Sequence, residues 1–218
     1  MTTSILGALL FAYFLAGIPI GLLVGRLRGI PDIRELGSGN IGATNVLRVL
    51  GTKAGVFVWV TDCLKGAVPV LAARYLFGLE GWAVGAAGVA ATAGHCFSPY
   101  LRLTGGRGVS TGLGVVTGLF WPAGICALTL FAVVVAKTRY VSLGSITAAS
   151  STVVWIILWG HFIDPYTFAY AVMAAACAAI IVARHAPNIQ RLCTGTERKL
   201  GQKVTAEHSQ GEGANAGV

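Results

Sequence analysis

The feature that most constrains the fold is a series of apolar runs of membrane-spanning length. The first run covers residues 4–25, and about 20 apolar residues suffice for a helix to cross roughly 30 Å of hydrocarbon. Further runs cover residues 54–76, 82–94, 109–119, 121–136, 143–160 and 165–183. Charged residues make up only 11% of the chain, against about 25% in a soluble domain. The sequence therefore predicts an all-α membrane bundle of about seven transmembrane helices.

The ends of the first run indicate that it is a retained span. No basic residue precedes it and no small-residue cleavage site follows, whereas Arg26 and Arg28 come directly after it. A cleaved signal peptide has the opposite arrangement, so we expect a membrane helix that is stopped by charge.

The basic residues predict how the spans are oriented. Nearly all of the 16 Lys and Arg residues follow the first, third, fifth and seventh runs. Because basic residues gather on the cytoplasmic side, this alternation predicts an N-terminus outside and a C-terminus in the cytoplasm. The alternative is that residues 109–136 form one span kinked at Trp121-Pro122, but fusing them would move the later basic groups to the opposite face. The prediction of two spans is therefore favoured.

This orientation places four polar stretches on the cytoplasmic face. They cover residues 26–53, 94–111, 137–145 and 184–200, so we expect them to form one composite site within a single domain over 1–200. The polar segment 201–218 lacks apolar residues for a core and is expected to be a disordered tail.

Cysteine usage and net charge narrow the classes of partner. The five cysteines are scattered without a C-x-x-C pair, which predicts small apolar fillers and no disulfide framework or zinc site. The formal net charge is +8, but the basic residues flank apolar runs. We therefore expect membrane lipids as partners and no nucleic acid.

The first polar stretch contains "GSGNIGATN", followed by Arg48. Glycines let successive backbone N–H groups point at one spot, and such a hollow binds anions. Side-chain and guanidinium donors strengthen that site. The candidates here are Ser38, Asn40, Gly42, Thr44, Asn45 and Arg48. The alternative is a flexible loop with a helix cap.

The second stretch, "GHCFSPYLRLTGGRGVSTGLG", again joins glycines to a guanidinium. If a helix starts at Gly108 or Val109, its free N–H groups favour an anion beside Gly105, Gly106 and Arg107. The spacing differs from that of a P-loop. The alternative is a membrane-surface turn with a snorkelling arginine.

Two more polar stretches carry pairs of residues three apart. Ser142 and Ser145 lie at the entrance of a run, where helix capping is the plain alternative. His185 and Asn188 are spaced to share one helix face, although a lone histidine at a membrane surface is often not catalytic.

Inside the second run, Asp62 and Lys65 are spaced i, i+3, so they can form an ion pair that turns the helix toward the bundle interior. We expect this pair to support the site rather than to react. The motifs of several other chemistries are missing: the sequence has no His-x-x-x-x-Asp, no aspartate cluster for a metal and no G-x-S-x-G. A face rich in anion binders suits a substrate that arrives activated and anionic.

Five motifs in order resemble the bacterial acyl-phosphate:glycerol-3-phosphate acyltransferase family. They are "GSGNIGATNVLR", "DCLKG", "GHCF…GGRG", "RYVSLGSI" and "RHAPNIQRLCTGTE", spread over residues 1–200. The resemblance implies a seven-helix protein of the bacterial inner membrane whose active site faces the cytoplasm. It implies acyl transfer from acyl phosphate to the 1-hydroxyl of glycerol 3-phosphate, with no metal or cofactor and neither acyl-CoA nor acyl carrier protein.

Matching the motifs position by position implies roles for individual residues. Catalytic roles fall to Ser38, Arg48, Arg107, Ser142, His185 and Asn188. Phosphate binding falls to Asn40, Gly42, Thr44, Asn45, Gly105, Gly106, Gly108 and Ser145, with support from Asp62, Lys65 and Glu197. The family usually has lysine where this chain has Arg107. The base stays open between His185 and a substrate phosphate.

The competing class is a transporter or channel for an organic phosphate. Such a protein typically shows broken spans with midplane polar residues and internal repeats. The sequence shows no clear repeat, and its polar groups gather at one face, so an enzyme is favoured.

Overall fold

The computed structural model describes residues 2–162 and 164–202, and these ranges contain helices and no strand. The α-helices are α1 Thr2–Gly17, α2 Ile20–Leu27, α3 Ala43–Leu50, α4 Thr52–Tyr75, α5 Gly81–Cys96, α6 Val109–Leu119, α7 Trp121–Thr138, α8 Val141–Gly160, α9 Thr167–Arg184 and α10 Ala186–Cys193, with 3-10 turns at η1 Ile33–Glu35 and η2 Pro99–Leu101. The predicted all-α class is confirmed for the described residues.

Five helical segments are long and apolar enough to cross a membrane. They are Thr2–Leu27, which joins α1 and α2, and the helices α4, α7, α8 and α9. Helices α5 and α6 are shorter, with 16 and 11 residues. The runs at 109–119 and 121–136 form separate helices, as predicted. Phe120 is extended between them, and Pro122 lies in the first turn of α7, where its missing N–H costs nothing.

The first run is not one continuous helix. It is interrupted at Ile18-Pro19, where proline has no N–H to continue the ladder of hydrogen bonds. The Lys65 ammonium on α4 donates to the carbonyl of Ile18 at 2.7 Å. A side chain from another helix thus adds a charge-assisted hydrogen bond to a carbonyl at the interruption, which also accepts from the Ile20 N–H at 3.0 Å.

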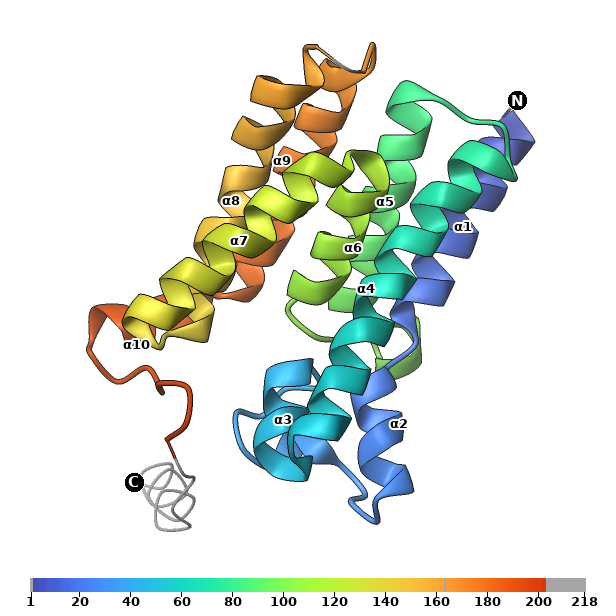
Figure 1. Ribbon diagram of the computed structural model, residues 1–218. Coiled ribbons are helices and arrows are strands. Elements are labelled where there is room, and N and C mark those ends of the chain that lie inside the picture. Colours follow the sequence, from blue (N-terminus) through green and yellow to red (C-terminus); the bar gives the residue numbers. More distant parts are fainter. Residues whose placement is uncertain (1, 163, 203–218) are drawn as a thin grey trace, which may run out of the picture.

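Helices pack closely through small residues, as expected where lipid surrounds the bundle. Helix α4 lies against α6, α1 against α5, and α7, α8 and α9 pack in sequence, with α5 joining the two groups (Figure 1). A Cβ on Gly66 of α4 would lie 2.0 Å from the carbonyl oxygen of Thr111 on α6. Glycine there lets the two backbones touch.

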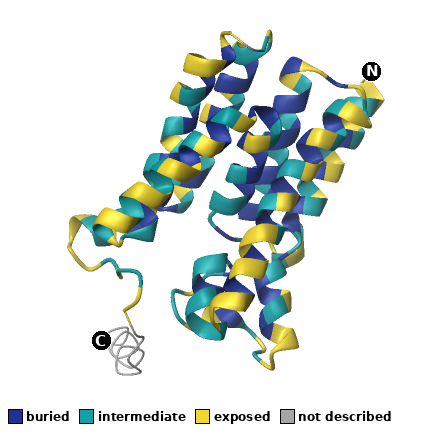
Figure 2. Ribbon diagram, viewed as in Figure 1, coloured by how far each residue is buried: buried dark blue, intermediate teal, exposed yellow. Residues whose placement is uncertain are grey.

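The outer surface of the bundle carries large apolar side chains, whereas the core is rich in alanine and valine. Among the exposed residues are Phe11, Phe57, Leu64, Ile157 and Phe168. Figure 2 shows exposed positions along the outer helices and buried positions toward the middle of the bundle. Large apolar side chains on the outside of a bundle are unfavourable in water. Contiguous apolar surface is accordingly rare on soluble monomers. The exposed side chains therefore mark surface that faces lipid.

The polar segments lie at one end of the bundle. In Figure 1, α3 and α10 lie at the lower end and the N-terminus at the upper end. The same lower end holds the loop before α6 and the start of α8, because residues of all four segments line one cavity. The expected gathering of four polar stretches is therefore found. Most of the predicted tail, residues 203–218, lies outside the described residues.

Candidate active site

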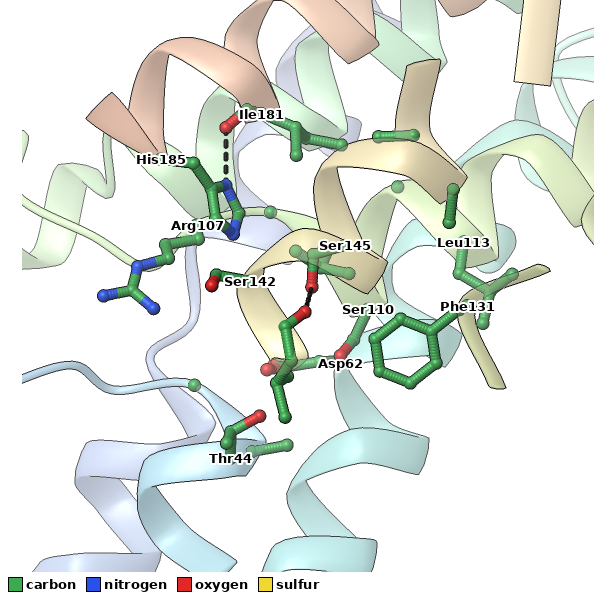
Figure 3. Close-up of a pocket in the computed structure, with 18 of the residues that line it drawn as sticks. Thr44, Asp62, Arg107, Ser110, Leu113, Phe131, Ser142, Ser145, Ile181 and His185 are labelled. Atoms are coloured by element: carbon green, nitrogen blue, oxygen red, sulfur yellow. Dashed lines mark hydrogen bonds between the residues drawn. The ribbon is translucent and has the colours of Figure 1, made fainter. Parts of the chain in front are cut away.

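A cavity of about 430 Å³ opens at this end of the bundle. Its wall is built by the segment before α3, α3 itself, and helices α4 to α10. Toward the end of the bundle the lining is polar, and along α6, α7, α8 and α9 it becomes apolar (Figure 3). We call these parts the mouth and the apolar channel.

One side of the mouth is the loop of residues 36–42 together with α3. Asn45 organises it, although only 1% of this residue is exposed. Its amide Nδ2 shares its two hydrogens among the carbonyls of Ile33, Leu36 and Asn40, at 2.8–3.1 Å. Its Oδ1 accepts from the backbone N–H of Ser38 at 2.6 Å and from the Ser38 hydroxyl at 3.1 Å. Asn45 thus shapes the loop, because both ends of its amide are occupied.

The remaining predicted residues of this loop line the cavity. Thr44 and Arg48 project from α3, and Asn40 accepts from the N–H of Gly42 at 2.8 Å. Arg48 forms neither a hydrogen bond nor an ion pair with any described residue. Burial, and then the like charge of Arg198, lowers its pKa. Arg48 remains protonated at neutral pH, since an arginine pKa starts above 12.

The opposite side of the mouth begins with the glycine loop before α6. Helix α6 starts at Val109, as expected, and the preceding Gly108 has φ 81°, a conformation that favours glycine. The first N–H groups of α6 have no intrahelical partner, because every helix leaves its first donors open. Arg107 lines the cavity beside them.

Gly105 and Gly106 do not line the cavity, so a direct phosphate contact from them is not supported. Their carbonyls accept from the Arg184 guanidinium at 3.0 and 3.3 Å. A Cβ on Gly106 would lie 2.1 Å from Nε2 of the buried His95. These two glycines therefore let the loop lie against Arg184 and His95, with Arg107 as its lining side chain.

Arg107 is the most desolvated cation of the mouth. Burial lowers its pKa to about 10, and the neighbouring arginines add to the shift while Glu197 opposes it. The guanidinium is still charged at neutral pH, and no described residue forms an ion pair or hydrogen bond with it. It is a partly buried positive charge that an anion would stabilise.

Helix α8 contributes two serines to the same space. Ser145 Oγ donates back to the carbonyl of Val141 at 2.8 Å. The buried Ser142 Oγ forms no well-aligned hydrogen bond with a described residue, but it lies near enough to Glu197 to help lower the pKa of that carboxylate. Neither caps α8, whose N-cap is Tyr140 without a side-chain bond. Helix capping therefore does not explain these serines, and Figure 3 shows the Ser142 hydroxyl between Arg107 and Thr44.

His185 lies between α9 and α10 and is only 1% exposed. Its Nδ1 is 2.8 Å from the carbonyl oxygen of Ile181. A carbonyl only accepts, so Nδ1 carries the hydrogen and Nε2 keeps its lone pair. Burial lowers the pKa of His185 to about 4. The ring is thus neutral at pH 7, with an acceptor available on Nε2.

Asn188 and Glu197 form a third cluster at the mouth. Asn188 Nδ2 donates to Glu197 Oε1 at 2.7 Å, and Arg191 Nε donates to Glu197 Oε2 at 2.8 Å. Burial alone would raise the pKa of Glu197, but its hydrogen-bond donors lower it. Asn188 Oδ1 is buried without a partner in the described part of the chain. Glu197 therefore fixes Asn188 in place and neutralises Arg191.

Asp62 and Lys65 pair as predicted, with an N–O distance of 3.0 Å. Asp62 lines the cavity, whereas Lys65 faces the interruption after α1. The pair joins the cavity wall to the junction between α1 and α2.

The apolar channel has no counterpart among the predicted site residues. Its walls are Leu113, Val116 and Leu119 of α6, Leu128 and Phe131 of α7, Ala148 and Thr152 of α8, and Ala174, Ala178 and Ile181 of α9. These side chains come from four helices, and their spacing in the sequence does not differ from that of ordinary core.

The cavity also brings in polar residues that the motifs did not single out. Arg191, Arg198, His95 and Ser110 all line it. His95 and Ser110 stand inside the "GHCF" and "GGRGVS" stretches, so their motif membership was the available signal. Arg191 likewise stands inside "RHAPNIQRLCTGTE", whereas Arg198 follows that motif and read only as a basic residue of a cytoplasmic segment.

These observations define an integral membrane protein whose helix bundle holds a cationic mouth joined to an apolar channel. The family model for glycerol-3-phosphate acyltransferase matches residues 6–195. The glycerol-3-phosphate acyltransferase of Syntrophotalea carbinolica is 46% identical over 198 residues, or 91% of this chain and 98% of the relative. The glycerol-3-phosphate acyltransferase of Geotalea daltonii is 45% identical over 195 residues, which are 89% of this chain and 97% of the relative.

A solved structure gives the same assignment. The crystal structure of PlsY (YgiH), an integral membrane glycerol 3-phosphate acyltransferase, in its glycerol 3-phosphate form matches with a TM-score of 0.83 and 39% identity, covering 91% of this chain and 96% of that chain. Its lysophosphatidic acid form matches with a TM-score of 0.82 and 38% identity. The chain therefore belongs to the glycerol-3-phosphate acyltransferase family.

Proposed function

We propose that this acyltransferase takes its fatty acyl group from acyl phosphate and transfers it to the 1-hydroxyl of glycerol 3-phosphate. The products are lysophosphatidic acid and inorganic phosphate. The observation that carries the proposal is a single cavity in which a cationic mouth continues into an apolar channel. An acyl phosphate has the same two parts, an anionic head and an apolar tail.

The charges of the mouth suit two phosphorylated substrates. Its lining includes two carboxylates, Asp62 and Glu197, and each is already paired with a cation. Arg48 and Arg107 have no carboxylate partner among the described residues. Two phosphates held side by side repel each other, and these guanidiniums would offset that repulsion. Ser38, Asn40, Thr44, Ser142 and Asn188 would add neutral hydrogen bonds.

The reaction needs mainly positioning, because acyl phosphate is a mixed anhydride with a good leaving group. The 1-hydroxyl oxygen attacks the acyl carbon, the carbon–oxygen bond to the phosphoryl group breaks, and phosphate leaves with the electron pair. Arg107 and the free N–H groups of α6 would stabilise the charge that develops on the carbonyl and on the phosphate.

The proton of the hydroxyl has two possible acceptors. With Nε2 unprotonated, His185 would accept the hydroxyl hydrogen bond and orient the oxygen. A pKa of about 4 makes it a weak base, so we propose that the departing phosphate takes the proton. Turnover by His185→Ala at saturating substrate would support the phosphate as base, and complete loss would assign the proton to histidine.

We propose seven membrane crossings, with α5 and α6 crossing alongside the five longer segments. The basic residues then place the N-terminus outside and the C-terminus in the cytoplasm. The mouth would face the cytoplasm of a bacterial inner membrane, from which glycerol 3-phosphate has direct access. Residues 1–200 would form one acyltransferase domain.

A donor comparison tests the proposal. Purified protein in detergent is incubated with glycerol 3-phosphate and equal amounts of acyl phosphate, acyl-CoA or acyl carrier protein loaded with the same chain. We expect lysophosphatidic acid and one equivalent of inorganic phosphate from acyl phosphate only. Product from acyl-CoA alone would overturn the donor assignment while leaving the acyltransferase family intact.

A further inference from the structure

The segment after α10 runs across the mouth of the cavity. We call residues 194–202 the strap. At its beginning, the backbone N–H groups of Thr196 and Glu197 donate to the carbonyl of Arg191 at 2.8 and 3.1 Å. At its end, Leu200 and Arg139 exchange hydrogen bonds: Leu200 N–H donates to the Arg139 carbonyl at 2.7 Å, and Arg139 Nη2 donates to the Leu200 carbonyl at 2.7 Å. Both ends of the strap are therefore fixed.

Arg198 stands between these two anchors and reaches the opposite side of the mouth. Its Nη1 donates to the carbonyl of Gly37 at 2.9 Å, directly before Ser38. Arg198 is exposed, lines the cavity and is close enough to Arg48 to lower the pKa of that guanidinium. It has no carboxylate partner among the described residues, although Glu197 precedes it in the chain.

A guanidinium in this position has an incomplete set of partners. One neutral carbonyl occupies one of its five N–H donors, whereas a phosphate accepts two parallel charge-assisted bonds. A dianion arriving at the mouth would therefore compete well with the Gly37 carbonyl. The two anchors of the strap would keep the Arg198 backbone in place while its long side chain moves.

The position of the reacting groups indicates which phosphate Arg198 meets. In acyl phosphate the phosphoryl group is bonded to the acyl carbon, so it must lie where the apolar channel begins, beside Arg107. In glycerol 3-phosphate the phosphate is on the carbon farthest from the 1-hydroxyl. When that hydroxyl points at the acyl carbon, the phosphate of the acceptor lies farther out, toward Arg48 and the strap.

We propose that Arg198 is a binding residue for the phosphate of glycerol 3-phosphate, exchanging the Gly37 carbonyl for that phosphate when the acceptor enters. This inference rests on the proposed use of the cavity as the reaction site. The strap thereby supplies a third guanidinium beside Arg48 and Arg107. When the Arg198 side chain moves away, the site for glycerol 3-phosphate opens to water, so product can leave through the mouth.

Steady-state kinetics of Arg198→Ala, Arg198→Lys and Arg28→Ala test the proposal. Arg28 is an exposed arginine at the end of α2 that does not line the cavity, so its removal controls for the loss of one positive charge at this end of the bundle. For Arg198→Ala we expect KM for glycerol 3-phosphate to rise about tenfold, the effect of losing one partly exposed charge-assisted bond. KM for the acyl donor and kcat should stay within about twofold.

Arg198→Lys should recover part of the loss, because it keeps the charge and lacks the fork, and Arg28→Ala should match the wild type. A normal KM for glycerol 3-phosphate in Arg198→Ala would overturn the inference. So would equal increases in both KM values together with lower thermal stability, since that pattern indicates a strap that merely holds the fold. The cavity assignment fails separately, if Arg107→Ala is fully active.

Discussion

The two sides of the mouth are built in different ways. The side formed by residues 36–48 is held together by its own neighbours, because Asn45 binds the carbonyls of the loop that precedes it. The opposite side, formed by the start of α6 and by α9 and α10, depends on distant partners. Arg184 on α9 donates a hydrogen bond to the glycine loop before α6. Glu197 in the strap accepts a hydrogen bond from Asn188 on α10.

The side formed by residues 36–48, the local side, is shaped by contacts between neighbours in the sequence. The opposite side, the distant side, exists only once the tertiary fold has formed. The local side holds Ser38 in place through Asn45 and presents Thr44 and the Arg48 guanidinium to the cavity. The distant side carries the most buried cation, Arg107, and the neutral histidine, His185. We infer that the local side mainly recognises phosphate, while the distant side also stabilises charge that appears during the reaction. Substitutions on each side test this division.

Replacing Arg107 should have the largest effect. Arg107→Ala removes the partly buried guanidinium that we propose lies beside the acyl carbon, and we expect kcat/KM to fall by at least about 100-fold. Arg107→Lys keeps the charge at the same position, so it should retain most activity. The measurement is initial-rate formation of inorganic phosphate. Equal activity of Arg107→Ala and the wild type would contradict a reactive role for this side.

Replacing Asn45 should have an intermediate effect that comes from the shape of the local side. Asn45→Ala removes the donor of the Asn40 carbonyl and the acceptor of the Ser38 N–H, and each lost hydrogen bond costs about 0.5–1.5 kcal/mol. The carbonyls of Ile33 and Leu36 each keep a backbone N–H donor. We expect a lower melting temperature and KM for glycerol 3-phosphate raised about tenfold.

Asn40→Ala is the matched control, because it loses a single bond to the nearby N–H of Gly42. It should change the melting temperature much less than Asn45→Ala. If the two variants melted alike, Asn45 would not be the centre of the loop.

The same division explains what the sequence could predict. The glycines, Ser38, Asn45 and Arg48 stand within a dozen residues, so short-range chemistry was enough to expect an anion-binding hollow there. The helices were predictable because apolar run length and the basic residues between runs both constrain them. Pro122 in the first turn of α7 is another local signal that matches its structure.

Contacts between distant segments were not predictable from one sequence. Nothing near Gly105 indicates that Arg184 binds its carbonyl, so a glycine that supports the loop was expected to touch phosphate. Arg198 looked like any basic residue of a cytoplasmic segment until the strap placed it opposite Gly37. The apolar channel is equally invisible, because four helices contribute side chains that otherwise resemble core.

The smallest expected effect is a change in how stability depends on pH, and it concerns the distant side. Burial lowers the pKa of His185 from 6.5 to about 4, with Arg107 adding to the shift and Glu197 and the Ile181 carbonyl opposing it. Between pH 6.5 and 4 the unfolded chain therefore binds a proton at this site that the folded protein does not. The contribution of neutral His185 to stability is complete above pH 6.5 and is lost as the pH falls toward 4.

His185→Gln removes this titration. Without substrate, the melting temperature of the wild type should fall by a few degrees more than that of His185→Gln between pH 7 and 4.5. Other titrating groups, including Glu197, act in both proteins, so the difference between the two curves isolates the histidine. Parallel curves would mean that His185 is already charged or open to water. The distant side would then lack a neutral Nε2 acceptor. The substrate phosphate would have to orient the hydroxyl as well as take its proton.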